Sequence, residues 1–375
     1  MDNFCTQGRD YKMIPCANPL AQYQSHQEEI SEAIKCVLKG GNYIYGHEVK
    51  AFEQSFSAYC GTDYAVGLNS GTDALILTMR ALNIGAGDEV ITVSHTALAT
   101  VAAIIASGAT PVLVDIEADY YTMDPACFKE AITPKTKAVI PVHLYGQPAA
   151  MDEIMIIARD HGILVIEDCA QATGATYKGN RVGSMGDAGC FSFYPTKNLG
   201  AIGDGGMVVT GNENLAQRIR RLAQYGWDEN RTTVESGYNS RLDEMQAAIL
   251  NVKLKSLDSD NTRRRTVAKA YDSILSTVQI VKPMERPDTN HVYHLYVIAS
   301  NKRDSLKINL QERGVLAKIH YPVPVHRNHG YDRKCILPAA GLPVTEYVVG
   351  VILSLPMYPE ISSIQLEVIA KCFVK

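Results

Sequence analysis

The segment ILVIEDCAQATGATYKGNRVGSMGDAGCFSFYPTKNLGAIGDGG, residues 163–206, contains the pattern that decides the fold. Two apolar runs typical of strands, ILVIEDCA (163–170) and GCFSFY (189–194), lie within it, and a glycine-rich turn follows the second. Lys197 lies between that second run and the glycines. It is either a surface lysine at a strand end or an amine held in a cavity, where burial lowers the pKa and creates a nucleophile or base. The segment alone does not decide between the two.

Strand and helix patterns alternate between about residues 60 and 210. Further apolar runs typical of strands are EVITVS (89–94), TPVLVDI (110–116), KAVIPVHLYG (137–146) and GGMVVTG (205–211). Helical patterns such as TDALILTMRAL and DEIMIIARDHG lie between several of them. Strands that are apolar on both faces and separated by helices predict an α/β fold with a mostly parallel sheet covered on two sides. Ligands bind such sheets beyond the carboxyl ends of the strands.

The second part of the chain has a different pattern. DEMQAAILNVKLKSL and TRRRTVAKAYDSIL predict a long, broken helical stretch, and strand and loop signals follow Val281. A length of 375 residues suits two domains. We therefore expect a large domain over residues 1–250 and a smaller C-terminal α+β domain over 251–375.

Composition narrows the class of protein. The net charge of −4 argues against a nucleic-acid-binding protein, because such proteins usually have a basic surface. Nine cysteines without framework spacing indicate reduced thiols and a cytoplasmic location. The N-terminal MDNFCTQGRDYKM lacks the apolar core of a signal peptide, and the longest low-charge stretch, residues 97–114, is broken by glycine and proline. We expect a cytoplasmic protein that binds no membrane.

Polar residues follow the strand ILVIED. Asp168 ends a strand predicted to be buried, where a carboxylate needs a cation or a hydrogen-bond donor. A protonated pyridine nitrogen is such a partner and is what a pyridoxal phosphate enzyme requires. Gln171 follows closely enough to reach a second ring substituent. An isolated aspartate here more often caps the next segment.

The run LNSGTDAL (68–75) predicts a turn followed by a helix. Ser70, Gly71 and Thr72 lie at its start, where free backbone N–H groups favour an anion such as a phosphate. Ordinary N-capping is the alternative interpretation. Ser192 can add a hydroxyl to the same phosphate. The nearby glycines form neither a dinucleotide fingerprint nor a P-loop.

Taken together, these residues resemble a known family. The chain resembles the sugar aminotransferases of the DegT/DnrJ/EryC1/StrS family, which have the type I, aspartate aminotransferase-like fold. The matching runs span nearly the whole chain: IPCANPLAQY, GNYIYGHEVKAFEQSFSAYCG, NSGTDAL, GATPVLVDI, PVHLYGQPAAMD, the central run 166–206, GYNSRLDEMQAAIL, HVYHLYV, HYPVPVH and LPVTE…SLPMYP. The fold implied is a large domain with a mostly parallel mixed sheet flanked by helices, plus a smaller C-terminal domain.

The resemblance implies a role for each candidate cofactor residue. Lys197 bonds covalently to pyridoxal 5'-phosphate, Asp168 pairs with the ring nitrogen, and Gln171 lies near the ring hydroxyl. The phosphate is expected at Gly71, Thr72 and Ser192. The family also shares its active site across a homodimer, so Asn239 of the GYNSR run is expected at the partner's phosphate, with Arg241 near that interface.

The resemblance also implies the substrate residues. His320, Tyr321 and His326 of HYPVPVH are expected along the sugar-nucleotide cleft, and Lys178 and Arg181 are candidate diphosphate contacts. Three histidines between residues 320 and 329 invite a metal interpretation, but their spacing puts them on no common helix face and no acidic ligand joins them, so we expect no metal.

One position departs from the family pattern. An aromatic residue usually stacks on the cofactor ring after the strand that ends near residue 94, but Ala97 stands there in SHTALAT. His95 either supplies a flat ring instead or is a core or capping histidine, and the sequence favours neither.

The function implied is a pyridoxal phosphate-dependent aminotransferase. It is expected to take an amino group, usually from glutamate in this family, through the pyridoxamine 5'-phosphate form of the cofactor to a keto-sugar nucleotide. HYPxPxH slightly favours a 3-keto sugar. Lysine at 197 argues against the dehydratase branch, which carries histidine there. A cyclitol-type ketone as substrate, or a non-catalytic regulator, are the alternatives.

Overall fold

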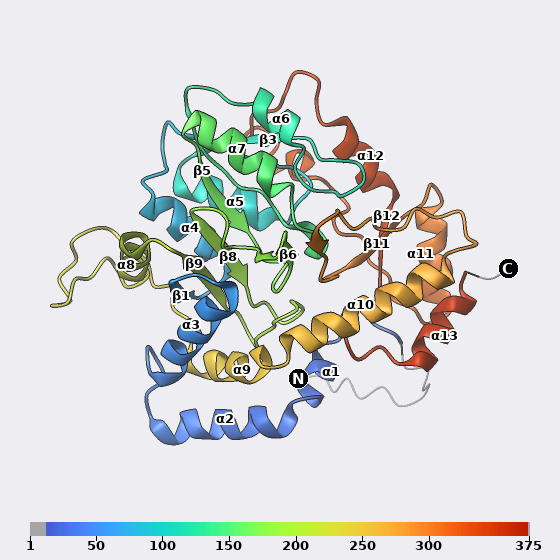
Figure 1. Ribbon diagram of the computed structural model, residues 1–375, viewed down its shortest axis with the longest axis horizontal. Coiled ribbons are helices and arrows are strands. Elements are labelled where there is room, and N and C mark those ends of the chain that lie inside the picture. The colour runs from blue at the N-terminus through green and yellow to red at the C-terminus, as the bar shows by residue number, and fades with distance from the viewer. Residues whose placement is uncertain (1–12, 374–375) are drawn as a thin grey trace.

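The computed structural model describes residues 13–373, so the N-terminal run without a signal-peptide core lies almost entirely outside the described residues. Its centre is a seven-stranded sheet in the order β1-β9-β8-β5-β4-β2-β3 (Figure 1). Neighbours are parallel from β3 to β8, whereas β9 is antiparallel to both β8 and β1. The expected mostly parallel mixed sheet is confirmed. The strand bounds are β1 Tyr64–Leu68, β2 Glu89–Val93, β3 Thr110–Val114, β4 Thr136–Val139, β5 Leu164–Asp168, β8 Ala188–Ser192 and β9 Gly206–Thr210.

One predicted strand is shorter than its apolar run. KAVIPVHLYG continues to residue 146, yet β4 ends at Val139 and the chain turns into the short 3-10 helix η1 (Leu144–Gly146). Pro141 has no N–H for a ladder bond, so the regular ladder does not continue past it. The segment still follows β5, because Asp168 N–H donates to the Pro141 carbonyl and His143 N–H donates to the Asp168 carbonyl.

Helices cover both faces of the sheet. The cluster that includes α4, α5 and α8 lies on one face, while α3, α6, α7 and α9 pack on the other. Alternate residues of one strand enter opposite cores: Ile166 of β5 packs in the first cluster and Val165 in the second. The helix bounds are α1 Pro19–Gln24, α2 Gln27–Gly40, α3 His47–Cys60, α4 Gly71–Ala81, α5 Leu98–Ser107, α6 Pro125–Glu130, α7 Met151–His161, α8 Glu213–Leu222 and α9 Glu244–Leu254.

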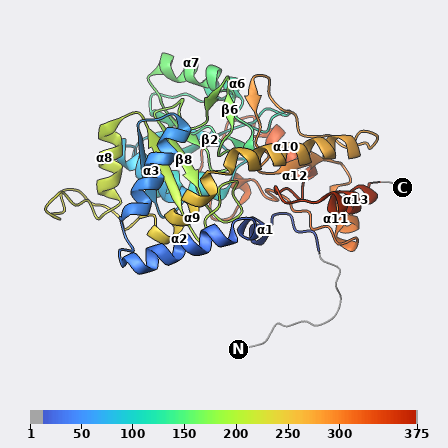
Figure 2. The same ribbon diagram turned by 60° about the horizontal axis from the view of Figure 1, so that its bottom comes forward.

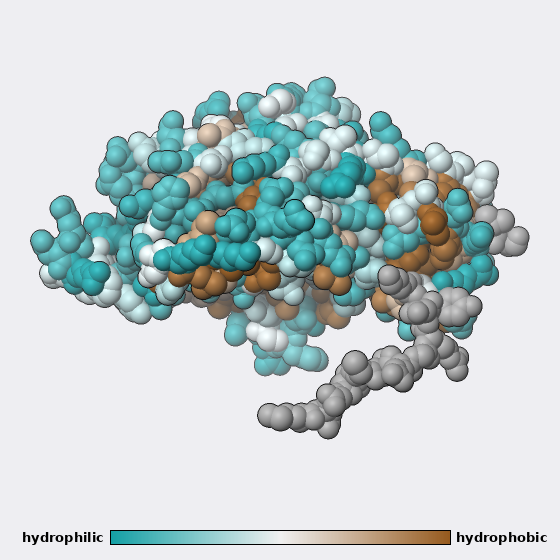
Figure 3. Space-filling model, turned by 90° about the horizontal axis from the view of Figure 1, so that it is seen from below, coloured by the Kyte–Doolittle hydropathy of each residue, from teal (hydrophilic) through white to brown (hydrophobic). Residues whose placement is uncertain are grey.

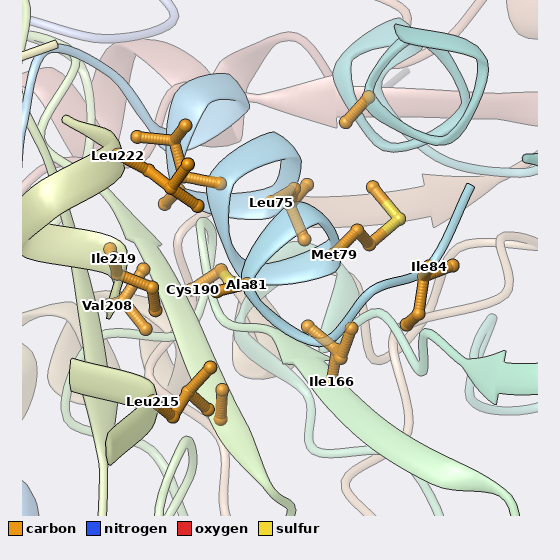
Figure 4. Packing of buried hydrophobic residues seen from close by; sticks show 14 of the residues in the cluster. Leu75, Met79, Ala81, Ile84, Ile166, Cys190, Val208, Leu215, Ile219 and Leu222 are labelled. Atoms are coloured by element: carbon orange, nitrogen blue, oxygen red, sulfur yellow. The ribbon is translucent and has the colours of Figure 1, made fainter. Parts of the chain in front are cut away.

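The core beneath α4 fixes the position of that helix. Leu75 and Met79 of α4 belong to one buried cluster with Ile166 and Cys190 of the sheet, and Leu215, Ile219 and Leu222 of α8 belong to the same cluster (Figure 4). Burial of side chains of this size contributes roughly 1.5–3 kcal/mol each. The packing therefore holds the N-terminus of α4 at the carboxyl edge of the sheet.

The C-terminal part is built around a second, two-stranded sheet. The long helix α10 runs from the large sheet to this part, beside α11 and α13 (Figures 1 and 2). The predicted helical stretch is broken at Lys255–Ser256, between α9 and α10, and the expected boundary near residue 250 falls within α9; the domain division itself stays a prediction. The bounds are α10 Leu257–Ile274, β11 Tyr296–Ala299, α11 Arg303–Glu312, η2 Val325–Arg327, α12 Pro343–Val351, β12 Ile352–Leu355 and α13 Ser363–Lys371.

A small three-stranded sheet in the order β10-β6-β7 lies apart from the large one. Its strands are β6 Thr176–Tyr177, β7 Asn180–Arg181 and β10 Thr289–Asn290. Among the described helices, none combines the length and the apolar composition that crossing a bilayer requires.

Candidate active site

The candidate residues lie at the carboxyl edge of the sheet, as the fold predicts. Asp168 is the last residue of β5, and Ser192 is the last residue of the adjacent β8. Gly71 begins α4, and Lys197 lies in the turns between β8 and β9. These residues come from three separate parts of the chain, and the order of the strands in the sheet brings them to one edge.

The surroundings of the Lys197 amine lower its affinity for a proton. Burial lowers its pKa from 10.5 to about 8, although the negative charge of Asp168 acts in the opposite direction. Lys197 is therefore not an ordinary surface lysine, since a solvated amine would keep its usual value. At neutral pH a useful fraction of the side chain is the free base, which is the form that acts as a nucleophile or takes up a proton.

The residue after Lys197 anchors its loop. The Asn198 amide nitrogen donates to Asn261 Oδ1 at 2.8 Å and to the Val292 carbonyl at 3.1 Å. His294 Nδ1 lies 3.2 Å from Asn198 Oδ1. Asn198 thus fastens the lysine loop to α10 and to the segment that precedes β11, and this limits how far Lys197 can move.

Asp168 is a buried carboxylate with uncharged hydrogen-bond partners. Thr100 Oγ1 donates to Asp168 Oδ2 at 2.8 Å, and the Ala170 N–H donates to Oδ1 at 3.1 Å. Only 5% of the residue is exposed. Because neither partner carries a charge, a cationic ring nitrogen is a fitting counterion for the carboxylate.

Gln171 connects the sheet edge with the HYPVPVH loop. Its Oε1 accepts from the Tyr145 N–H at 2.8 Å, and its Nε2 donates to the Tyr321 hydroxyl at 2.8 Å. The Tyr145 hydroxyl donates in turn to the His320 carbonyl. Three hydrogen bonds and the peptide bond between His320 and Tyr321 close a ring of four residues, which holds Tyr321 near Asp168. Burial is the main reason that the pKa of Tyr321 rises to about 12, so its hydroxyl stays protonated.

His320 lies on the same loop, close enough to the Lys197 amine for its charge to act on the imidazole. Burial and the positive charges of Lys318 and Lys197 lower its pKa to about 4. Its Nδ1 lies 2.9 Å from Ser354 Oγ. A neutral imidazole beside Lys197 can accept or donate a hydrogen bond without adding charge to the site.

The N-terminus of α4 forms an anion cradle. Ser70 caps the helix, because its hydroxyl accepts from the Asp73 N–H at 3.1 Å, and the Ser70 carbonyl accepts from the Ala74 N–H. The N–H groups of Gly71 and Thr72 precede the first helical hydrogen bonds and point out of the helix. A Cβ on Gly71 would lie 2.7 Å from the Ser192 Cβ, so only glycine allows Ser192 to come this close.

These features together fit pyridoxal phosphate. The cradle of Gly71, Thr72 and Ser192 suits the phosphate, since helix N-termini bind such anions. Asp168 suits the ring nitrogen, and Lys197 suits the aldehyde carbon.

His95 is a buried histidine whose tautomer is fixed by its neighbour. Its Nε2 lies 2.7 Å from the Tyr145 hydroxyl, and the one proton of that hydroxyl goes to the His320 carbonyl. Nε2–H is therefore the donor, and Nδ1 is a buried acceptor without a partner among the described residues. Burial lowers the pKa of His95 to about 4. Its ring meets Tyr121 and Tyr145 edge to face, and stacking on the cofactor stays a prediction.

Three candidate substrate residues are occupied elsewhere. His326 binds Ser94 Oγ at 2.7 Å through Nδ1 and Glu346 at 3.2 Å through Nε2, which fastens η2 to the end of β2. Lys178 pairs with Asp152 of α7. Arg181 lies 2.9 Å from Asp258 and stacks on Tyr59 at 4.2 Å. The structure does not bring these three side chains into contact with Lys197, and their substrate roles stay predictions.

Asn239 lies near the end of a loop that extends beyond α8, and Arg241 follows that loop. Asn239 is exposed and forms an isolated bridge with Gln224, whereas Arg241 is half-buried. Neither belongs to the group around Lys197 in this single chain. An exposed asparagine is available to a second subunit, which agrees with the expected role but does not test it.

One cluster has the composition of a metal site. His143, Glu167 and Cys169 place their ligand atoms within 4.8 Å of one another. Glu167, however, already accepts from His143 Nε2 and from the N–H groups of Gly183, Met185 and Gly186. His143 Nδ1 accepts from the Ala149 N–H. These donors occupy the lone pairs a metal would need, so the cluster is a structural anchor of β5.

Sequence reasoning missed several residues of the site, namely Thr100, Tyr145, Asn198 and His294. Thr100 and Tyr145 bind the candidate residues Asp168 and Gln171 directly, whereas Asn198 and His294 bind each other and so hold the loop that carries Lys197. The spacing of Thr96 and Thr100 places both on one side of a helix start, and that signal was available in the sequence. The contacts of Tyr145 and His294 join segments far apart in the chain, and local patterns carry no sign of them.

Comparisons with known proteins found similar sequences over nearly the whole chain. The model of the DegT/DnrJ/EryC1/StrS aminotransferase family matches residues 24–374. The dTDP-3-amino-3,4,6-trideoxy-alpha-D-glucose transaminase of Streptomyces venezuelae is 47% identical over 349 residues, covering 93% of this chain and 92% of that protein. The UDP-N-acetyl-3-dehydro-alpha-D-glucosamine 3-aminotransferase of Acidithiobacillus ferrooxidans is 44% identical over 358 residues, covering 95% and 96%.

Two solved structures superpose on nearly the whole chain. The crystal structure of S. venezuelae DesV in complex with a ketimine intermediate superposes with a TM-score of 0.93 at 46% identity, covering 96% of this chain and 97% of that one. The structure of NtdA from Bacillus subtilis with bound cofactor PMP has a TM-score of 0.89 at 31% identity, covering 98% and 86%.

Proposed function

The chain belongs to the DegT/DnrJ/EryC1/StrS aminotransferase family, and on that premise we propose that it transfers an amino group from glutamate to the keto group of a sugar nucleotide. It is a pyridoxal phosphate-dependent aminotransferase with the type I fold. The observation that carries the proposal is the Lys197 amine, which burial brings to a pKa of about 8 beside the Asp168 carboxylate.

Different residues of the chain carry out different parts of the amino transfer. Pyridoxal phosphate, when bound, supplies an electron sink for the charge that develops at the donor's Cα. Asp168 keeps the ring nitrogen cationic, and the α4 cradle holds the phosphate. With the cofactor bound, Lys197 Nζ would take the proton from the donor's Cα and deliver it to the former aldehyde carbon of the cofactor, and it would reverse this transfer when the keto sugar replaces the donor.

A 3-keto sugar nucleotide is the substrate we propose. Two similar proteins carry names that place the amino or keto group at C3 of a dTDP or UDP sugar. Both share more than 40% of their residues with this chain over nearly its full length. The neutral His320 and the protonated Tyr321 hydroxyl supply uncharged hydrogen bonds suited to sugar hydroxyl groups.

A homodimer with shared active sites is part of the proposal. The loop of residues 224–240, here called the arm, extends outward beyond α8 (Figures 1 and 2). Glu235 fastens it by accepting from Arg218 at 3.1 Å and from Arg221 at 2.8 Å. Apolar side chains are exposed on the arm and near the site, and they also gather on the face seen from below (Figure 3). Those on the arm and beside the lysine loop are Tyr194, Ile202, Tyr225, Val234 and Tyr238.

We also propose a cytoplasmic location. The cysteines of the described residues are all free, including several that are buried, which suits a reducing compartment.

The experiment that tests the function starts from protein loaded with pyridoxamine phosphate. Mixing it with 3-keto and 4-keto sugar nucleotides is expected to restore the yellow cofactor band with a 3-keto compound, and the Lys197→Ala variant should restore none. Return of the band with a cyclitol-type ketone, and with no sugar nucleotide, would overturn the substrate assignment.

A further inference from the structure

Two threonine hydroxyls form a hydrogen-bonded row that ends at the Asp168 carboxylate. Thr96 Oγ1 lies 2.9 Å from Thr100 Oγ1, and Thr100 Oγ1 lies 2.8 Å from Asp168 Oδ2. Both threonines are buried, with 3% and 0% of their surface exposed. Thr100 belongs to the first turn of α5 and Thr96 lies just before it, so the start of one helix presents both hydroxyls to the end of β5.

The direction of both hydrogen bonds follows from the inventory of protons. An ionised carboxylate only accepts, so Thr100 gives its single hydroxyl proton to Asp168 Oδ2. Thr100 Oγ1 is then the acceptor for Thr96, whose proton completes the row. Hydrogen bonds aligned in this way strengthen one another in a buried site.

The rest of Asp168 is held equally firmly. Its Oδ1 accepts from the Ala170 N–H, its N–H donates to the Pro141 carbonyl at 2.9 Å, and its carbonyl accepts from the His143 N–H at 3.1 Å. Rotation of the carboxylate would break at least one of these bonds. Thr100 therefore contacts the one carboxylate oxygen that no backbone group holds.

We propose that Thr100, supported by Thr96, is a positioning residue whose hydrogen bond to Oδ2 holds the Asp168 carboxylate in the orientation that meets the cofactor's ring nitrogen. The inference rests on the cofactor site proposed above. Hydrogen bonds to a carboxylate stabilise its charged form. Without the Thr100 bond the carboxylate holds the shared proton more strongly, the ring nitrogen loses positive charge, and removal of the donor's Cα proton becomes slower.

The test uses cofactor labelled with ¹⁵N in the ring, bound to Thr100→Val, Thr100→Ser and Thr92→Val proteins. Thr92 is a matched control, because it is a fully buried threonine that donates to the Ile140 carbonyl at 2.9 Å and does not contact Asp168. In Thr100→Val the ring ¹⁵N resonance should move toward that of unprotonated pyridine, and the glutamate half-reaction should slow about tenfold or more. Thr100→Ser and Thr92→Val should match the wild type.

Two results would overturn the proposal. One is a ¹⁵N resonance in Thr100→Val equal to that of Thr92→Val. The other is a Thr100→Ser protein as impaired as Thr100→Val, which would show that the methyl group and not the hydroxyl matters. If Thr100→Val fails to fold, the Thr96→Val protein replaces it in the test. It should shift the ring ¹⁵N resonance in the same direction by a smaller amount. An unchanged resonance would show that Thr96 does not support Thr100.

The outcome is separable from the proposed function. The ¹⁵N measurement needs no sugar substrate, so a protein that acts on a different ketone would leave it unaffected. A wild-type protein that binds no cofactor would instead refute the cofactor site itself.

Discussion

The Gln171 amide donates a hydrogen bond of 2.8 Å to the Tyr321 hydroxyl, and this bond joins the edge of the large sheet to the loop that precedes η2. Gln171 Oε1 is bound to the Tyr145 N–H, so the amide cannot turn away without a further loss. The residue expected at the cofactor ring therefore also holds a residue expected at the substrate.

Removing either partner of this bond should weaken the same interaction. We expect Gln171→Leu and Tyr321→Phe each to lower kcat/KM for the keto substrate, and the double variant to lose less than the sum. The coupling should be about 0.5–3 kcal/mol, as for other residues in direct contact. Tyr347→Phe, at an exposed position of α12, is the control. Strictly additive losses would show that the two side chains act independently.

The lowered pKa of Lys197 predicts a pH dependence of cofactor uptake. Cofactor-free protein should take up pyridoxal phosphate at a rate that rises with pH and is half-maximal near pH 8. Asp168→Asn should move the midpoint lower, because the Asp168 charge raises the pKa. Stopped-flow absorbance measures both, and a midpoint near 10.5 would show that Lys197 is solvated.

The lowered pKa of Lys197 also predicts how the free energy of unfolding changes with pH. Between pH 8 and 10.5 the unfolded chain holds a proton on Lys197 that the folded chain has lost, so this residue makes the free energy of unfolding rise with pH. Lys197→Met lacks that contribution and should be the more stable protein at pH 7. Denaturant titrations of both proteins at pH 7 and 10 check the sign, and an equal slope with pH would contradict it.

Gly71 should be required for phosphate binding. In Gly71→Ala the new Cβ lies 2.7 Å from the Ser192 Cβ, so the α4 cradle must open. Overpacking of this kind costs about 1–3 kcal/mol, which corresponds to a loss of pyridoxal phosphate affinity of about 5- to 150-fold. Gly350→Ala is the matched control, because a Cβ there meets nothing within 4 Å. Equal cofactor affinity in the two variants would place the phosphate elsewhere.

A shared active site predicts complementation between inactive subunits. Lys197→Ala and Asn239→Ala homodimers should both be impaired. A mixed dimer contains one site with Lys197 from one subunit and Asn239 from the other, and that site should be active. Activity is therefore expected to return after the two proteins are unfolded and refolded together. No recovery, with mixed dimers shown by mass spectrometry, would mean that each chain forms its site alone.

The fold was predictable because its signals are local. The runs around Ile166 and Val208 are apolar on both faces, and such strands between helices fit only a covered sheet. Their order along the chain also predicts which loops share an edge, so Asp168, Ser192 and Lys197 could be placed together. Pro141 is the exception: the apolar run around it continues past β4, but a proline cannot donate to the ladder.

The supporting contacts were not predictable, because they depend on residues distant in the chain. Arg181 looks like an anion-binding residue until Asp258 of α10 is placed beside it. Lys178 is likewise paired with Asp152 of α7. A basic side chain in a sequence shows its charge but not its partner, and only the packing of helices against the β6–β7 hairpin supplies one.

The central claim is that Lys197 is the amine to which the cofactor is bound. Reduction of the pyridoxal phosphate-loaded protein with borohydride, followed by peptide mapping, tests it most directly. We predict a single stable cofactor label on Lys197, and the same treatment of Lys197→Ala should leave none. A label on any other lysine of the wild-type protein, or no label at all, would contradict the account.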